Sequence, residues 1–142
     1  MAFTTAKAAD SAFYEAFANG NHSAVMRVWS KSDDIVCVHP MGPRLTGHEP
    51  ISASWVQILA GGPQRNFEIQ LINQWGDDIL VVHVVNEIIS VPASNLEFNP
   101  VLATNVYRCI DGNWYMSAHH ASIDVSGQLA ENPTDGVPPT RH

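Results

Sequence analysis

Apolar residues recur at helical spacing through the first third of the chain. Ala9, Phe13 and Phe17 stand four residues apart, which predicts a helix over residues 5–19 with a single apolar stripe. An Asn-Gly pair ends this helix, and the Asn that follows it can cap a second short helix over residues 21–29. The chain therefore opens with two helices.

A third helix is expected after a short strand. Residues 35–39 form a β-branched run that is closed by Pro40, which predicts the strand. Thr46 and Glu49 have the spacing of a capping box, so we expect the helix to begin there and to end at the Gly-Gly-Pro of residues 61–63.

The pattern then changes to that of strands. An Asp-Gly pair at residues 111–112 is the strongest hairpin signal in the chain. The strands are expected over residues 67–75, 79–91, 101–110 and 114–125.

Segregated helices and antiparallel strands predict an α+β fold. A curved, mainly antiparallel sheet wrapped around the N-terminal helices would leave a cone with one open end. We expect a single domain over residues 1–126. Residues 127–142 contain three prolines and few apolar side chains, which predicts a loosely ordered tail.

Composition excludes several classes of partner. Seven Lys and Arg against fourteen Asp and Glu give a net charge of −7, which disfavours nucleic acid and anionic membranes as partners. No apolar run approaches the length of a membrane span, and residues 1–12 lack the pattern of a signal peptide, so we expect a cytoplasmic protein. Cys37 and Cys109 each lie in an apolar run and are expected to be reduced, buried thiols.

Histidine supplies the best candidate chemistry. His39 ends a strand and precedes a turn, where a side chain can face a cavity, and imidazole suits proton transfer near neutral pH. A histidine that only bonds a loop carbonyl is the alternative. His119 and His120 are adjacent on a strand and must point to opposite faces. We expect His120 inside, because it shares a face with Trp114 and Met116.

Polar and aromatic residues on the strands and short helices complete the candidate pocket. Asn105 and Tyr107 share one strand face, and Asn86 lies within a β-branched strand, whereas its neighbour Glu87 is expected to be exposed. Trp29 and Trp55 are either core residues or walls of the pocket. Two histidines and one strand residue match no zinc pattern, so neither a metal nor a cofactor is expected.

The chain resembles the SnoaL-like, or nuclear transport factor 2-like, α+β cone proteins. The order and spacing of several segments carry this resemblance over about residues 5–125. These segments are residues 19–21, 28–30, 38–42, 45–47, 54–55, 103–108, 112–114 and 119–122.

The resemblance implies a small, partly apolar ligand and a homodimer. The superfamily includes steroid isomerases, polyketide cyclases, dehydratases and a kinase association domain, so the fold alone does not assign an activity. Steroid isomerases carry their acidic base where this chain has His39, before Pro-x-Gly. Their two oxyanion donors fall near Phe13 and Asn105, and Phe13 has no hydroxyl, which argues against steroid isomerase activity.

Two functions follow as expectations. The first is a ligand-binding domain that works as a His-assisted isomerase, cyclase or dehydratase, with His39 as base and Asn105 polarising a carbonyl. Trp29, Trp55 and Tyr107 would shape its walls. The alternative is a non-catalytic dimeric association or ligand-sensing module, which would pair through Val82, Val84 and Ile110 on the outer sheet face.

Overall fold

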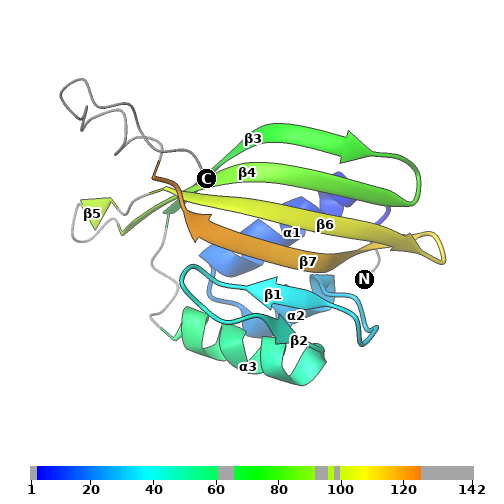
Figure 1. Ribbon diagram of the computed structural model, residues 1–142, viewed down its shortest axis with the longest axis horizontal. Helices are drawn as coiled ribbons and strands as arrows, with labels where there is room; N and C mark the ends of the chain where they lie inside the picture. Colours follow the sequence, from blue (N-terminus) through cyan, green and yellow to red (C-terminus); the bar gives the residue numbers. More distant parts are fainter. Residues whose placement is uncertain (1–2, 61–65, 92–95, 98–99, 126–142) are drawn as a thin grey trace, which may run out of the picture.

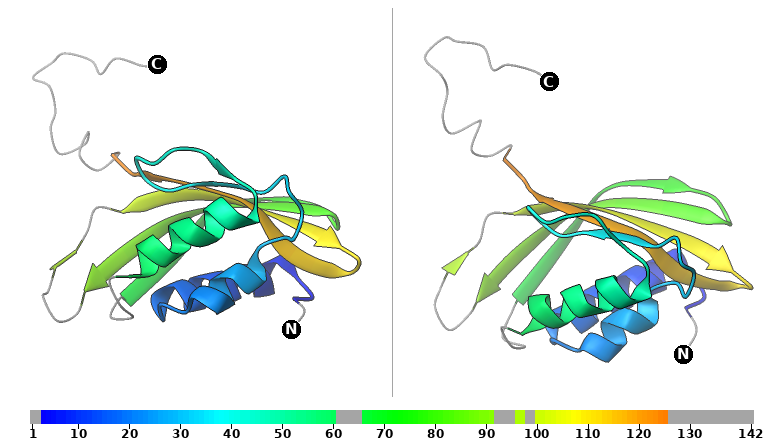
Figure 2. Two further views of the ribbon diagram at one scale, coloured as in Figure 1. Left: turned by 90° about the horizontal axis from the view of Figure 1, so that it is seen from below. Right: turned by 60° about the horizontal axis from the view of Figure 1, so that its bottom comes forward.

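Three helices cover one side of a curved sheet (Figure 1). The structure is a computed structural model and describes residues 3–60, 66–91, 96–97 and 100–125. Figure 2 shows the sheet arching over the helices. The elements are α1 (Ala6–Ala18), α2 (His22–Val28), β1 (Val36–Val38), β2 (Leu45–Thr46), α3 (His48–Leu59), β3 (Asn66–Gly76), β4 (Leu80–Val91), β5 (Leu96–Glu97), β6 (Val101–Ile110) and β7 (Asn113–Ile123).

Side chains fix the starts of the first two helices but not of the third. The hydroxyl of Thr5 accepts a hydrogen bond from the Ala8 amide at 3.0 Å, and the side chain of Asn21 caps α2 in the same way. The capping box expected at Thr46 is wrong. Thr46 belongs to β2, and α3 begins after Gly47, which has a φ of 83° and no side chain to cap the helix.

The strands form one sheet in the order β2-β1-β7-β6-β4-β3, with β5 also pairing with β4. All pairs are antiparallel except β1 with β7. Asp111 and Gly112 have φ values of 52° and 82°, as a tight hairpin requires, so the hairpin prediction is confirmed. The α+β class and the curved, mainly antiparallel sheet around the helices are confirmed as well.

An extra residue interrupts the pairing of β6 with β7. Val106 pairs with Ala118, but the next β6 residue, Tyr107, pairs with Met116, so Ser117 has no partner across the ladder. Such a bulge reverses which alternate residues face the interior. Met116 is buried before the bulge, and His119 is buried after it.

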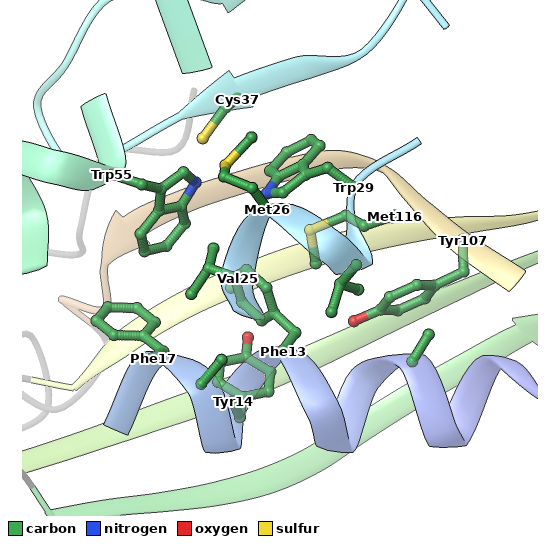
Figure 3. Close-up of a cluster of buried hydrophobic side chains, with 14 of the residues drawn as sticks. Phe13, Tyr14, Phe17, Val25, Met26, Trp29, Cys37, Trp55, Tyr107 and Met116 are labelled. Carbon is green, nitrogen blue, oxygen red and sulfur yellow. The ribbon is translucent and has the colours of Figure 1, made fainter. Parts of the chain in front are cut away.

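The core lies between the helices and the concave face of the sheet. Phe13 and Phe17 of α1 both meet Trp55 of α3 edge to face, with ring centroids 5.4 and 4.9 Å apart (Figure 3). Trp29 is also fully buried, beside Met116. This aromatic cluster holds α1 and α3 together at the end of the sheet where β1 meets β7.

Some expectations concern residues that the structure does not describe. The loosely ordered tail falls there, and so do residues 61–63, which were expected to end the third helix. The helix itself ends at Leu59, with Ala60 as its C-cap. The domain boundaries remain a prediction. Among the described residues, no helix is both long enough and apolar enough to cross a membrane.

Gly76 is expected to be the glycine most sensitive to substitution. It has a φ of 142°, and a Cβ there would lie 2.2 Å from the Leu80 carbonyl oxygen and 2.6 Å from the Val81 Cα. We expect Gly76→Ala to lower the free energy of unfolding by about 3 kcal/mol, because strain and overlap add.

Gly112→Ala is the matched control for this prediction. Gly112 has a φ of 82°, but a Cβ there meets nothing within 4 Å, so only about 1 kcal/mol of strain is expected. Urea unfolding of both variants measures the difference. Equal losses of the free energy of unfolding in the two variants would show that overlap with β4 does not determine the effect of Gly76→Ala.

Candidate functional site

A cavity of about 310 Å³ lies between α1, α3 and one end of the sheet. We call it the first cavity. Most of its wall is apolar, and three titratable side chains interrupt that wall. Its lining residues are Phe17, His39, Pro40, Ile58, Glu87, Ile89, Val101, His119 and Ala121.

The parallel pairing of β1 with β7 brings His39 to the first cavity. Its Nε2 lies 2.9 Å from the hydroxyl of Ser54, which donates its own proton to the Ile51 carbonyl at 2.7 Å. Nε2 must therefore carry the proton of His39, and Nδ1 keeps the lone pair. Burial lowers the pKa of His39, so the ring is neutral at pH 7 and Nδ1 is available as a base.

A chain of three buried hydrogen bonds links α1 to three strands. Tyr14 donates to Glu87 Oε2 at 2.6 Å and accepts from the Asn105 amide nitrogen at 2.8 Å. The Asn105 amide oxygen therefore accepts from Nδ1 of His119 at 2.6 Å, which leaves Nε2 of His119 with the lone pair. We call Tyr14, Glu87, Asn105 and His119 the buried network.

Burial changes the acidity of both ends of the buried network. The pKa of Glu87 is raised to about 7, because desolvation and the charge of Asp10 outweigh the hydrogen bond from Tyr14. Desolvation lowers the pKa of His119 to about 3, with a smaller contribution from His39 and His120. Near neutral pH the cavity thus holds two neutral imidazoles and a carboxyl group that is half protonated.

The structure reverses the expected orientation of two adjacent pairs. His120 is exposed and His119 lines the cavity, because the bulge at Ser117 shifts the alternation that Trp114 and Met116 begin. Glu87 is 2% exposed and faces the cavity, whereas Asn86 is half-buried on the outer face. The assignments of His120 and Asn86 to the pocket are therefore wrong in orientation.

The remaining candidate residues do not line the first cavity. Asn105 is fully buried with both ends of its amide engaged, so it orients His119 instead of facing a ligand carbonyl. Tyr107 is buried and donates to Asp10 at 2.5 Å. Trp29 and Trp55 are core residues, although Trp55 packs edge-on against His39 at 4.9 Å.

Sequence reasoning missed two residues of the buried network. Tyr14, the residue after Phe13, carries a buried hydroxyl, but its place beside an apolar helix stripe gave no sign of a polar partner. Glu87 was missed because a strand carboxylate is usually exposed. Its buried position depends on which face of β4 meets α1.

Neither cysteine chemistry nor a metal centre is evident in the described residues. Cys37 Sγ lies 3.6 Å from Nε2 of His39, but burial raises the pKa of the thiol to about 12. Over the same part of the chain, no three His, Cys, Asp or Glu side chains are grouped as metal ligands would be.

Comparison with known proteins places this arrangement in a family. A family model described as SnoaL-like domain matches residues 6–126. The F-box protein SKIP8 of Arabidopsis thaliana is 26% identical over 103 residues, which cover 70% of this chain. The match spans 41% of that relative's length.

Solved structures agree over most of the chain. A protein of Thiobacillus denitrificans, provisionally named as a calcium/calmodulin-dependent protein kinase type II association domain, is 29% identical with a TM-score of 0.83. The match covers 87% of this chain and 98% of the other. An NTF2-like protein of Streptomyces avermitilis, provisionally named as a dehydratase, is 26% identical with a TM-score of 0.72, covering 83% and 92%.

The raised pKa of Glu87 predicts a pH-dependent effect of Glu87→Gln. In the wild type, the folded state holds the proton of Glu87 up to pH 7, whereas the unfolded state releases it near 4.5. As the pH rises from 4.5 to 7, the free energy of unfolding of the wild type therefore falls by about 1.4 kcal/mol per pH unit, which amounts to about 3 kcal/mol. The Gln variant lacks this loss.

We therefore expect the stability of Glu87→Gln relative to wild type to rise by about 3 kcal/mol between pH 4.5 and 8. Urea unfolding at several pH values measures it, and the titration of His119 is common to both proteins and cancels. Glu15→Gln makes the same substitution at an exposed position of α1 and is the control for the buried position. A pH-independent difference for Glu87→Gln would contradict the buried carboxyl.

Proposed function

This chain belongs to the SnoaL-like domain family, and from that premise we propose that it binds a small, uncharged, largely apolar molecule and transfers a proton on it. The site is the first cavity. One observation carries the proposal, which is that an otherwise apolar wall presents His39, Glu87 and His119 together. Apolar cavities with a few convergent polar groups are the usual form of small-molecule sites.

The protonation states define which molecules fit. His39 and His119 each offer a lone pair, and Glu87 is either a neutral donor or an anion. None of these groups attracts a carboxylate ligand. A ketone or alcohol suits the site, because it can accept from protonated Glu87 or donate to an imidazole.

The arrangement supports enolisation of a carbonyl compound. Nδ1 of His39 takes a proton from the carbon next to the carbonyl, and the electron pair of that C–H bond forms a C=C bond. Glu87 in its protonated form gives its proton to the carbonyl oxygen, which yields an enol. Opposite pKa shifts on a base and an acid in one site are the pattern that such catalysis needs.

This mechanism predicts deuterium exchange into cyclic ketones. In D2O, the protein should accelerate loss of the α-proton signal, measured by NMR, and His39→Ala should lower the rate by about 100-fold or more. The rate should rise as His39 loses its proton and fall again through about pH 7 as Glu87 ionises. Glu87→Gln should remove the fall above pH 7.

His120→Ala is the matched control, because its ring is adjacent in sequence and exposed. It should exchange at the wild-type rate. A parallel thermal-shift series should show stabilisation by cyclic ketones and none by small carboxylates. Stabilisation by carboxylates alone would contradict the proposal, as would full activity in His39→Ala.

A specific observation also favours the alternative function, a dimeric association module. The outer face of the sheet carries apolar residues, and α1, α2 and α3 all lie on the other face (Figure 2). Trp75 is 57% exposed and pairs across the strands with Val82, which in turn pairs with Val106. Val82 and Val84 are half-buried, and Ile110 is 38% exposed. A second copy of this chain would cover this face, and the similarity to a protein named as an association domain supports that partner.

Sedimentation velocity tests this dimer. We expect a concentration-dependent dimer that Trp75→Glu converts to monomer, because a buried carboxylate at an apolar interface is costly. Val56→Glu introduces the same charge at a 51% exposed position on α3 and should leave the dimer intact. A wild-type protein that remains monomeric at high concentration rules this interface out.

A further inference from the structure

A second cavity of about 430 Å³ lies between α1 and the strands β3 and β4, and shares no lining residue with the first. Its inner residues are buried, and its outer residues are exposed. Tyr14, His83 and Val85 form the buried floor. Lys7, Ser11, Leu71 and Gln74 are exposed at the rim, and Asp10 and Ile69 lie between.

The floor of the second cavity contains an unpaired histidine. His83 is 3% exposed, and neither ring nitrogen has a hydrogen-bond partner within the described part of the chain. Its Nδ1 lies 3.5 Å from Asp10 Oδ1, which is beyond a good hydrogen bond. A buried polar group left unpaired is destabilising, so a molecule that supplied both partners would gain affinity from these hydrogen bonds.

The wall beside His83 carries both signs of charge. Lys7, Asp10, Ser11 and Tyr14 have the spacing of one helix face, so α1 presents an ammonium and a carboxylate one turn apart. Tyr107 donates to Asp10 Oδ1 at 2.5 Å, and no donor among the described residues bonds the other oxygen, Oδ2. Asp10 therefore has one oxygen available to a cation.

The rest of the wall is aliphatic. Ile69 and Leu71 of β3 face the cavity together with Val85 of β4. A ligand with a single charge would match only one of Lys7 and Asp10. The two ring nitrogens of His83 can each form a hydrogen bond, so His83 also matches a ligand that carries both an acceptor and a donor.

We propose that the second cavity binds an amino acid with an aliphatic side chain. The ammonium group contacts Asp10, the carboxylate faces Lys7, and the side chain packs on Ile69, Leu71 and Val85. His83 hydrogen-bonds both charged groups. The proposal for this site does not rest on proton transfer in the first cavity.

Calorimetric titration of the full chain with L-leucine tests the proposal. 4-Methylpentanoate, which lacks the ammonium, and 3-methylbutylamine, which lacks the carboxylate, are the matched ligands. We expect leucine to bind about tenfold more tightly than either. No binding of leucine up to about 10 mM, or equal binding of all three compounds, would overturn it.

Variants locate the binding. Asp10→Asn should weaken leucine about tenfold, because the carboxylate is largely shielded from solvent. Lys7→Gln should weaken it about threefold, since the exposed charge of Lys7 is screened by solvent. Lys31→Gln, at an exposed position outside the cavity, is the control and should bind as wild type.

The first cavity supplies the final discrimination. His39→Ala should leave leucine affinity unchanged, because His39 does not line the second cavity. Leucine binding that is lost in His39→Ala and retained in Asp10→Asn would place the ligand in the first cavity and refute the second site. Failure of ketone exchange in the wild type, with leucine binding intact, would refute only the proton-transfer proposal.

Discussion

The hydrogen bond from Tyr14 to Glu87 joins the first helix to the middle of the sheet, and the rest of the buried network depends on it. If Tyr14 were displaced, Asn105 would lose a partner for its amide nitrogen, and the orientation of that amide would no longer be fixed. Nδ1 of His119 would then lack a defined acceptor. Each of these groups is buried, so each break would leave an unsatisfied polar atom at a cost of about 1–3 kcal/mol. Packing and chemistry therefore depend on the same contacts.

The acid–base properties of the first cavity follow from the way the core closes around it. Burial disfavours the charged form of every group. It therefore raises the pKa of Glu87 and lowers the pKa of His39 and of His119. Asp10, which belongs to the wall of the second cavity, adds its negative charge to the effect on Glu87. A cation bound at Asp10 would reduce that contribution. The two cavities are thus electrostatically linked through the interior, although they share no wall.

Hydrophobic spacing was sufficient to predict the fold but not the site. The helices, the long strands and the Asp111-Gly112 hairpin are local features, and each was visible in the sequence. His39 was also found, since a strand end before Pro-x-Gly is a local signal. The orientation of His119 depends on a bulge at Ser117. Strict alternation from the apolar residues at the start of β7 would turn His119 outward, so the sequence pattern cannot reveal the bulge. Tyr14 and Glu87 required knowledge of how α1 lies on β4, which is a tertiary property.

The bulge at Ser117 adds one residue to β7 that has no partner in β6. Every side chain beyond the bulge lies on the face opposite to the one that strict alternation would give it, while the strand continues to pair with β6 and β1. Loss of Ser117 alone would place Ala118 directly after Met116 in the ladder, and His119 would still pair with Asn105 and face the cavity. A lineage could therefore gain or lose a residue here and keep a histidine at the site throughout. What would change is the local bend and twist of β7, so the shape of the strand could diverge while the interior chemistry persisted.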